Sequence, residues 1–396
     1  MNSSSSRMKI AFLTTGDPSS RNSWSGIDYY MAQALDQYCG DVCYPSHLMP
    51  SFRYNLGRIV NKASSTILHR KYAYLHSFLM SKGYAQRVHR WLAHKHFDLI
   101  FVPSAAPVAA FLATRIPIAY VSGTTFALMC SYYDQFSNLL DISVREGNAI
   151  EQALIDKSKI LLYPTEWPAR SAVTDYQADR SKIHIVPYGA NLDREDVPPV
   201  DLVRGRKRSR KCRLLFIGVD WERKGGRIAF DTLVELEKLG VDAELTVCGC
   251  VPPGDLSHAR MTIIPFLDKD DSSQRRQFSS LLLNSDFLLV PTRSECFGVV
   301  FCEASAFGLP SISTDTGGVS GVVSEGENGH LLPLSAAGED YARLIAEIHC
   351  DEKRCLELSM SSRRVFEERL NWDTWGKTVG SLLKDVVNSD CRYCTR

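Results

Sequence analysis

The sequence predicts an α/β protein built from two domains, each with a parallel sheet. Short apolar segments alternate with helical segments, which is the pattern of βα units. Residues 8–15 form an apolar strand, residues 16–26 a polar loop with glycines, and residues 27–38 a helix with a 3.6-residue apolar period. The same order of strand, loop and helix returns over residues 212–239. With 396 residues, the chain is long enough for about two to three domains.

The composition is that of a globular protein without a membrane span. The apolar content of 44% and the charged content of 23% are ordinary for a soluble fold and exclude a disordered chain. No run of 18 apolar residues occurs, and the first ten residues lack the apolar core of a signal peptide. The twelve cysteines lie singly or within apolar strands, so we expect reduced thiols. We therefore expect a cytoplasmic protein, with membrane association left open.

The most informative segment covers residues 291–318, PTRSECFGVVFCEASAFGLPSISTDTGG. It follows an apolar strand and passes through a polar turn into a helix over residues 299–307. Open α/β sheets bind ligands at the carboxyl ends of their strands, and the N–H groups at a helix N-terminus suit an anion such as diphosphate. We therefore expect phosphate to be bound by the backbone N–H groups of Phe297, Gly298 and Val299.

Two carboxylates, Glu295 and Glu303, lie eight residues apart around this helix N-terminus. Carboxylates accept hydrogen bonds from sugar hydroxyls. The segment resembles the Glu-x7-Glu signature of glycosyltransferase family 4, which comprises nucleotide-sugar enzymes of the GT-B fold. The resemblance also rests on the motifs Phe297-Gly298, Gly308-Leu309-Pro310 and Gly317-Gly318. The competing interpretation is a pair of solvated helix glutamates.

The resemblance implies a GT-B fold, in which two Rossmann-like βαβ domains face each other across a cleft. It implies transfer of a sugar from a UDP- or GDP-sugar to an acceptor hydroxyl, with retention of anomeric configuration and without a metal or a cofactor. Glu295 would hold the sugar hydroxyls and Glu303 the ribose hydroxyls. The loop at Phe266 would lie near the nucleotide base, and Gly26 beside the donor diphosphate.

Two cations form a second candidate site at the start of the helix that follows strand 212–218. Arg223 and Lys224 lie beside a positive helix end, where cations are unfavourable unless an anion binds. The pair resembles the diphosphate clamp of family 4, so we assign catalytic roles to Arg223, Lys224 and Glu295. The competing interpretation is a solvated basic turn.

The sequence departs from the family pattern at two places. Val219 stands where many members have an arginine, and Arg223 is a candidate replacement. Ser122 and its neighbours stand where many members have a catalytic-site His or Asp, which leaves the acceptor-side contact unassigned. The Asp-x-Asp at Asp268 and Asp270 lies in the middle of the second βα domain, so we do not expect it to bind a metal.

Residues 42–97 contain nine Lys or Arg residues and no Asp or Glu. Basic residues interleaved with apolar ones suit an anionic membrane surface, so peripheral membrane contact and a lipid-linked or anionic acceptor are one interpretation. A solvated basic face is equally compatible with the pattern. Nucleic acid is not expected, because no nucleic-acid module is recognisable.

The expected organisation has four parts. Residues 1–192 form the acceptor-side domain, which the family-like string VPYGAN closes. Residues 193–211 form a basic linker, and residues 212–372 form the nucleotide-sugar domain. Residues 373–396 form a helix that crosses back to the first domain, as the resemblance implies.

The function expected from this resemblance is hexosyl transfer in glycan, polysaccharide or glycolipid biosynthesis. One alternative is a catalytically inactive, glycosyltransferase-like subunit that binds nucleotide or a partner, and the departures at Ser122 and Val219 keep it open. Another is a sugar-nucleotide epimerase, which acts without an acceptor. The strand ends of the first domain are poor in carboxylates and histidines, which argues against the epimerase.

Overall fold

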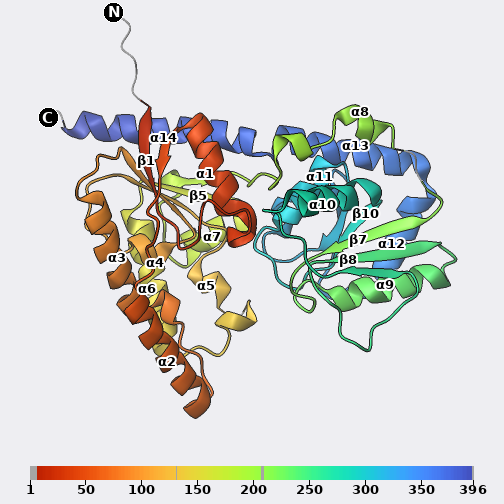
Figure 1. Cartoon of the computed structure of the whole chain (residues 1–396), viewed down its shortest axis with the longest axis horizontal. Coiled ribbons are helices and arrows are strands. Elements are labelled where there is room, and N and C mark those ends of the chain that lie inside the picture. Colours follow the sequence, from red (N-terminus) through yellow and green to blue (C-terminus); the bar gives the residue numbers. More distant parts are fainter. Residues whose placement is uncertain (1–6, 131, 207–208, 395–396) are drawn as a thin grey trace, which may run out of the picture. The chain divides into compact units, whose positions relative to one another are not determined.

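The computed structural model describes residues 7–130, 132–206 and 209–394, with side chains up to residue 388. The chain forms two compact units (Figure 1). Unit 1 contains the chain up to Val186 and again from Trp375, and unit 2 contains Pro187–Thr374. Each unit is built around its own parallel sheet.

Unit 1 holds a parallel sheet with the strand order β2-β1-β3-β4-β5-β6. Its strands are β1 Met8–Phe12, β2 Gly40–Cys43, β3 Leu99–Pro103, β4 Ile118–Val121, β5 Ile160–Tyr163 and β6 Ile183–Ile185. Its helices are α1 Ile27–Tyr38, α2 Ser51–Ile67, α3 Phe78–Leu92, α4 Ala106–Ala109, α5 Phe126–Met129, α6 Asp141–Lys157, α7 Glu166–Thr174 and most of α14 Trp372–Cys394. Short 3-10 turns lie at η1 Ser23–Gly26, η2 Tyr74–His76, η3 Asp134–Phe136 and η4 Arg180–Lys182.

Helices cover both faces of this sheet because side chains alternate along each strand. Ile100 and Val102 of β3 pack into a core shared with α3, α4 and α6. On the opposite face, Phe101 stacks on Phe12 with a ring-centroid distance of 5.9 Å. Trp375 of α14 meets Phe101 edge-on at 6.2 Å, so the last helix closes the core on this side.

Unit 2 holds a second parallel sheet, with the order β12-β11-β10-β7-β8-β9. Its strands are β7 Cys212–Ile217, β8 Ala243–Cys248, β9 Met261–Ile264, β10 Phe287–Val290, β11 Ser311–Thr314 and β12 Gly329–Leu332. Its helices are α8 Val200–Arg204, α9 Gly226–Lys238, α10 Ser272–Asn284, α11 Val299–Ala306, α12 Gly338–Cys350 and α13 Glu352–Glu368, with 3-10 turns at η5 Arg194–Asp196 and η6 Val319–Gly321.

The strand order of unit 2 fixes where a ligand binds. Read from β9 to β12, the strands occur in the sequence 3-2-1-4-5-6 of dinucleotide-binding folds. The order reverses between β7 and β10, which pair in parallel through Leu214 and Phe287. Ligands of open parallel sheets bind outside the carboxyl ends of the two strands at such a reversal. The loops after β7 and β10 are therefore the place to look for a site.

The segment between the two sheets packs on unit 2. The Ala190 N–H donates to the carbonyl of Leu370 at 2.9 Å, so the VPYGAN string belongs to unit 2 from its second residue, Pro187, onward. The division after Val186 falls a few residues before residue 192. In the basic segment 193–211, Arg206 donates to the carbonyl of Phe307 at 2.7 Å. Residues 207 and 208 of this segment lie outside the described residues.

The packing of α14 makes a prediction about unit 1. Replacing the buried Trp375 by Ala should lower the free energy of unfolding of unit 1 by about 3–5 kcal/mol, because it leaves a cavity beside Phe101. Hydrogen exchange of peptides covering β1 and β3 measures the change locally. The exposed Leu356 of α13 supplies the control, Leu356→Ala. Unchanged protection of β3 in Trp375→Ala would contradict the packing.

Candidate functional site

The loops after β7 and β10 touch each other at the carboxyl edge of the sheet in unit 2. The Arg293 N–H donates to the carbonyl of Arg223 at 2.7 Å. Gly225 has the left-handed φ of +74°, and a Cβ there would lie 1.9 Å from the carbonyl oxygen of Pro291. Glycine is therefore required where the first loop turns into α9 against the second loop.

This contact brings three of the predicted residues together. Lys224 forms an ion pair with Glu295, and both side chains are only 12% exposed. The Arg223 Nη1 lies 3.7 Å from the same Glu295 oxygen. Burial by itself raises the pKa of the Glu295 carboxyl, but the cations of Lys224 and Arg223 outweigh that effect and hold the pKa below its ordinary value. Glu295 is thus a buried carboxylate that stays ionised.

The neighbouring backbone leaves room for this pair. A Cβ at Gly218 would come within 2.7 Å of the Lys224 side chain, so the glycine at the end of β7 lets the lysine lie across the strand end. The Glu295 carbonyl accepts a hydrogen bond from the Gly318 N–H at 3.1 Å, which ties the loop after β11 to the pair. An ammonium group has three donors, and Glu295 uses one, so Lys224 retains donors for an anion.

The predicted helix N-terminus lies beside Glu295. α11 begins at Val299 after Gly298, whose left-handed φ of +83° starts the turn. Gly298 has no side chain with which to cap the helix. The first N–H groups of α11 can therefore donate hydrogen bonds only to the backbone or to a ligand. The Phe297 ring is buried and packs edge-on against Tyr188 at 5.1 Å. Any role of Phe297 in binding therefore belongs to its backbone.

Glu303 of α11 has a partner that sequence analysis missed. Its carboxylate accepts from the Lys269 Nζ at 2.5 Å, and its side chain is 4% exposed. The ammonium group also lies 4.2 Å from the centroid of the Phe278 ring. Lys269 is the middle residue of the Asp-x-Asp string. The sequence indicated only that Lys269 lies in a loop after a strand, and not that it pairs with Glu303. The pair links the loop after β9 to α11.

One of the two aspartates of this string forms a hydrogen bond within its own loop. The Asp268 carboxylate accepts from the Asp270 N–H at 2.8 Å and so stabilises its own loop. Among the described residues, no group of three or more His, Cys, Asp or Glu side chains is arranged to hold a metal ion. At the same sheet edge, Phe266 is more than half exposed, as is Val219 after β7.

Gly26 lies in unit 1, in the loop after β1. It has a left-handed φ of +88° and follows two more left-handed residues, Trp24 and Ser25. Such backbone outliers cost free energy and cluster at functional sites. A buried carboxylate that sequence analysis missed, Asp28, follows in the first turn of α1 and accepts from the Thr14 hydroxyl at 2.8 Å. Burial raises the pKa of Asp28 to about 6.

Ser122 lies at the carboxyl end of β4 in the same unit. Its hydroxyl is buried and donates to the carbonyl of Thr124 at 2.6 Å. The structure thus gives this serine a turn-forming contact, and the acceptor-side His or Asp of the family pattern has no substitute at this position.

Comparison with known proteins relates much of unit 2 to glycosyltransferases. Residues 204–365 match the family model described as glycosyl transferases group 1. The D-inositol 3-phosphate glycosyltransferase of Corynebacterium glutamicum is 26% identical over 300 residues, which is 70% of this chain and 68% of the relative. The residues that the family model matches include both loops of the candidate site.

Solved structures show the fold of the whole chain. Sucrose-phosphate synthase from Thermosynechococcus elongatus superposes with a TM-score of 0.71 at 16% identity, over 97% of this chain and 100% of the other. HepE from Anabaena, solved in complex with UDP, superposes with a TM-score of 0.65 at 16% identity, over 96% of this chain and 100% of the other. The predicted two-domain α/β fold of the GT-B type is confirmed. Together with the family match, these structures support a glycosyltransferase.

The ion pair predicts an unusual pH dependence when its cation is removed. In the native protein the depressed pKa of Glu295 contributes stability that is present at neutral pH and is lost as the pH falls through the folded pKa. In Lys224→Met, burial outweighs the remaining partners and the pKa rises. The stability of unit 2 should then fall as the pH increases from about 5 to 8, where the native protein changes little.

Hydrogen exchange of α11 over this pH range measures the effect. The control is Arg227→Met, because Arg227 is an exposed cation on the first turn of α9 that pairs with Asp231. Parallel pH profiles for Lys224→Met and the native protein would show that Lys224 does not set the ionisation of Glu295.

Proposed function

We propose that this chain is a retaining glycosyltransferase of family 4 that moves a hexose from a UDP- or GDP-sugar to an acceptor hydroxyl. The observation that carries the proposal is the buried Lys224–Glu295 pair at the strand-order reversal of unit 2, beside the N-terminus of α11. The solved structures of HepE with UDP and with UDP-glucose, which share the fold, support a nucleotide-sugar donor.

The barrier of sugar transfer arises from charge, which becomes positive at the sugar C1 and negative on the departing diphosphate. Arg223 and Lys224 bind the diphosphate and stabilise the negative charge of the leaving group. The backbone N–H groups of Phe297, Gly298 and Val299 add the positive end of α11. In this scheme the protein's own cations stabilise the leaving group, without a metal ion.

The two glutamates position the donor. Glu295 is kept ionised by its cations and accepts hydrogen bonds from the sugar hydroxyls, which fixes C1 against the acceptor. Glu303 accepts from the ribose hydroxyls, and Lys269 holds its carboxylate in place. Phe266, exposed at the same sheet edge, packs against the nucleotide base. Positioning of this kind is worth several kcal/mol of barrier.

Retention follows from attack on the face that the diphosphate leaves. The bond from C1 to the diphosphate oxygen breaks, the bond from C1 to the acceptor oxygen forms on the same face, and the acceptor proton passes to the departing phosphate oxygen. Glu295 is not the nucleophile in this scheme, because its carboxylate is tied to Lys224 and Arg223. The acceptor hydroxyl belongs to a glycan, a polysaccharide or a glycolipid.

Substitution of the pair tests the catalytic assignment. Glu295→Ala and Lys224→Ala should each lower kcat/KM by at least about 100-fold, because each removes a charge that stabilises or positions the transition state. The control Arg227→Ala removes a cation from the first turn of the same helix, outside the pair, and should keep native turnover. Release and transfer of radiolabelled sugar from UDP- and GDP-sugars measure both. Near-native turnover in Glu295→Ala would refute the assignment.

The stereochemical course is a separate prediction. Transfer from an α-linked donor should give an α-linked product, which the anomeric proton coupling in a nuclear magnetic resonance spectrum reports directly. A β-linked product would contradict same-face attack while leaving the donor site intact. Conversion of the donor to another sugar nucleotide without any acceptor would instead identify an epimerase.

A further inference from the structure

Helix α2 of unit 1 carries an apolar stripe that nothing in the described chain covers. Its apolar side chains recur at spacings of four, three, one, three and four residues, which places them within about 100° of the helix circumference. They are exposed to solvent, with exposed fractions of 82% at Phe52, 66% at Ile59 and 74% at Ile67. The full stripe consists of Phe52, Leu56, Ile59, Val60, Ala63 and Ile67.

The opposite side of α2 holds the helix on the unit. Gly57 lies against Tyr74, where a Cβ would come within 2.6 Å of the tyrosine side chain. The Asn61 side-chain oxygen accepts from the Tyr72 N–H at 2.8 Å, and the Arg53 guanidinium donates to the carbonyl of Leu79 at 3.0 Å. Small and polar residues thus face the protein, whereas helices of globular proteins turn their apolar side inward.

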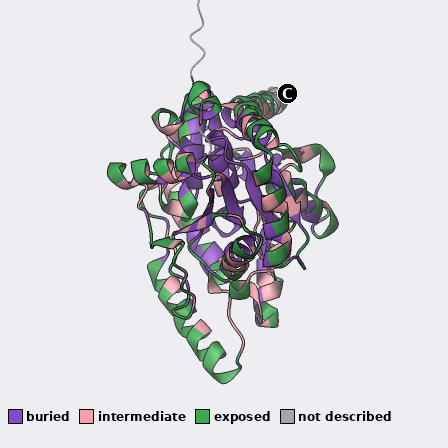
Figure 2. Cartoon of the chain, turned by 90° about the vertical axis from the view of Figure 1, so that its right-hand side faces the viewer, coloured by how far each residue is buried: buried purple, intermediate pink, exposed green. Residues whose placement is uncertain are grey.

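The position of α2 leaves this stripe accessible. Figure 2 shows the helix as a mostly exposed ribbon, and in Figure 1 it extends away from the sheet of unit 1. Only Gly57 and Ser64 are buried along its whole length. An apolar stripe with this exposure favours an apolar surface as its partner.

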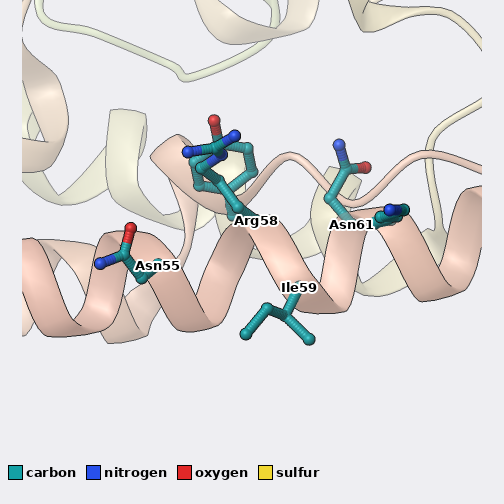
Figure 3. Close-up of a pocket in the computed structure, with 6 residues that line it drawn as sticks. Asn55, Arg58, Ile59 and Asn61 are labelled. Carbon is teal, nitrogen blue, oxygen red and sulfur yellow. The ribbon is translucent and has the colours of Figure 1, made fainter.

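Two cations lie beyond one edge of the stripe, on the polar side of α2. Arg58 and Lys62 line a groove of about 490 Å³ on α2, together with the amides Asn55 and Asn61. In Figure 3 the side chains of Arg58 and Asn61 project to one side of the helix and Ile59 to the other. No Asp or Glu occurs in residues 42–97, so the charged side chains of α2 itself are all positive.

We infer that α2 docks this protein on an anionic lipid bilayer, with its apolar stripe in the acyl boundary and Arg58 and Lys62 against the phosphate groups. A helix with an apolar side, a basic side and no acids has the composition of an interfacial helix. No helix in the described part of the chain is long and apolar enough to span a membrane, so the contact is peripheral. The inference goes beyond the proposed transfer reaction and does not depend on it.

Two other occupants fit the surface less well. A second copy of the chain, docked through the same helix, would place Arg58 and Lys62 of both copies near each other without any acid of residues 42–97 to compensate. A nucleic acid would neutralise the cations but leave Phe52, Ile59 and Ile67 in water. A bilayer offers acyl chains to the apolar stripe and phosphate groups to the cations.

Vesicle binding of the full chain tests this inference. The native protein should sediment with vesicles of phosphatidylcholine mixed with phosphatidylglycerol, and only weakly with pure phosphatidylcholine. The variant Phe52→Ser/Ile59→Ser/Ile67→Ser should lose at least about tenfold in partitioning, because three anchors no longer leave water. Arg58→Glu/Lys62→Glu should lose the preference for the anionic lipid.

The matched control removes the same number of exposed apolar residues from unit 2, as Leu202→Ser/Leu239→Ser/Leu356→Ser, and should bind like the native protein. Equal binding by the control and the stripe variant would overturn the inference. So would a native protein that does not bind anionic vesicles. Self-association that only the stripe variant loses would overturn it in favour of a second copy. Because sugar transfer to a soluble acceptor is measured separately, failure here leaves the proposed function standing.

Discussion

The ion pair between Lys224 and Glu295 is the interaction on which the candidate site depends. A buried pair of this kind gives little stability, because desolvation offsets most of the attraction. It does keep a carboxylate ionised in a position where burial alone would favour its protonation. It also keeps a cation at a helix N-terminus, which is unfavourable without a compensating anion. The loops at the strand-order reversal thus hold two charges ready for a ligand that carries phosphates and hydroxyls.

A second pair extends this arrangement along the sheet edge. Lys269 and Glu303 join the loop after β9 to α11, while Lys224 and Glu295 join the loop after β7 to the loop after β10. Each pair links segments that are far apart in the sequence and adjacent only because the strand order places them so. The parallel topology of unit 2 therefore builds the site, and the individual side chains supply its charge.

Sequence reasoning found the features that local patterns encode. Glu295, Gly298 and the cations at Arg223 and Lys224 follow apolar strands directly, so their place at a sheet edge could be predicted. The partner of Glu303 could not, because Lys269 is brought near it by packing in three dimensions. The basic and apolar residues interleaved over residues 42–97 likewise did not show which side of α2 faces solvent, and the packing of Gly57 against Tyr74 decides that.

A crystal structure of this chain with UDP or GDP tests the candidate site. We expect a diphosphate at the N-terminus of α11, with the Lys224 Nζ and the Arg223 guanidinium within hydrogen-bond distance of its oxygens. We also expect the Glu303 carboxylate on the ribose hydroxyls. A diphosphate bound away from the loops after β7 and β10, or Lys224 still engaged by Glu295 alone, would contradict the assignment of this site.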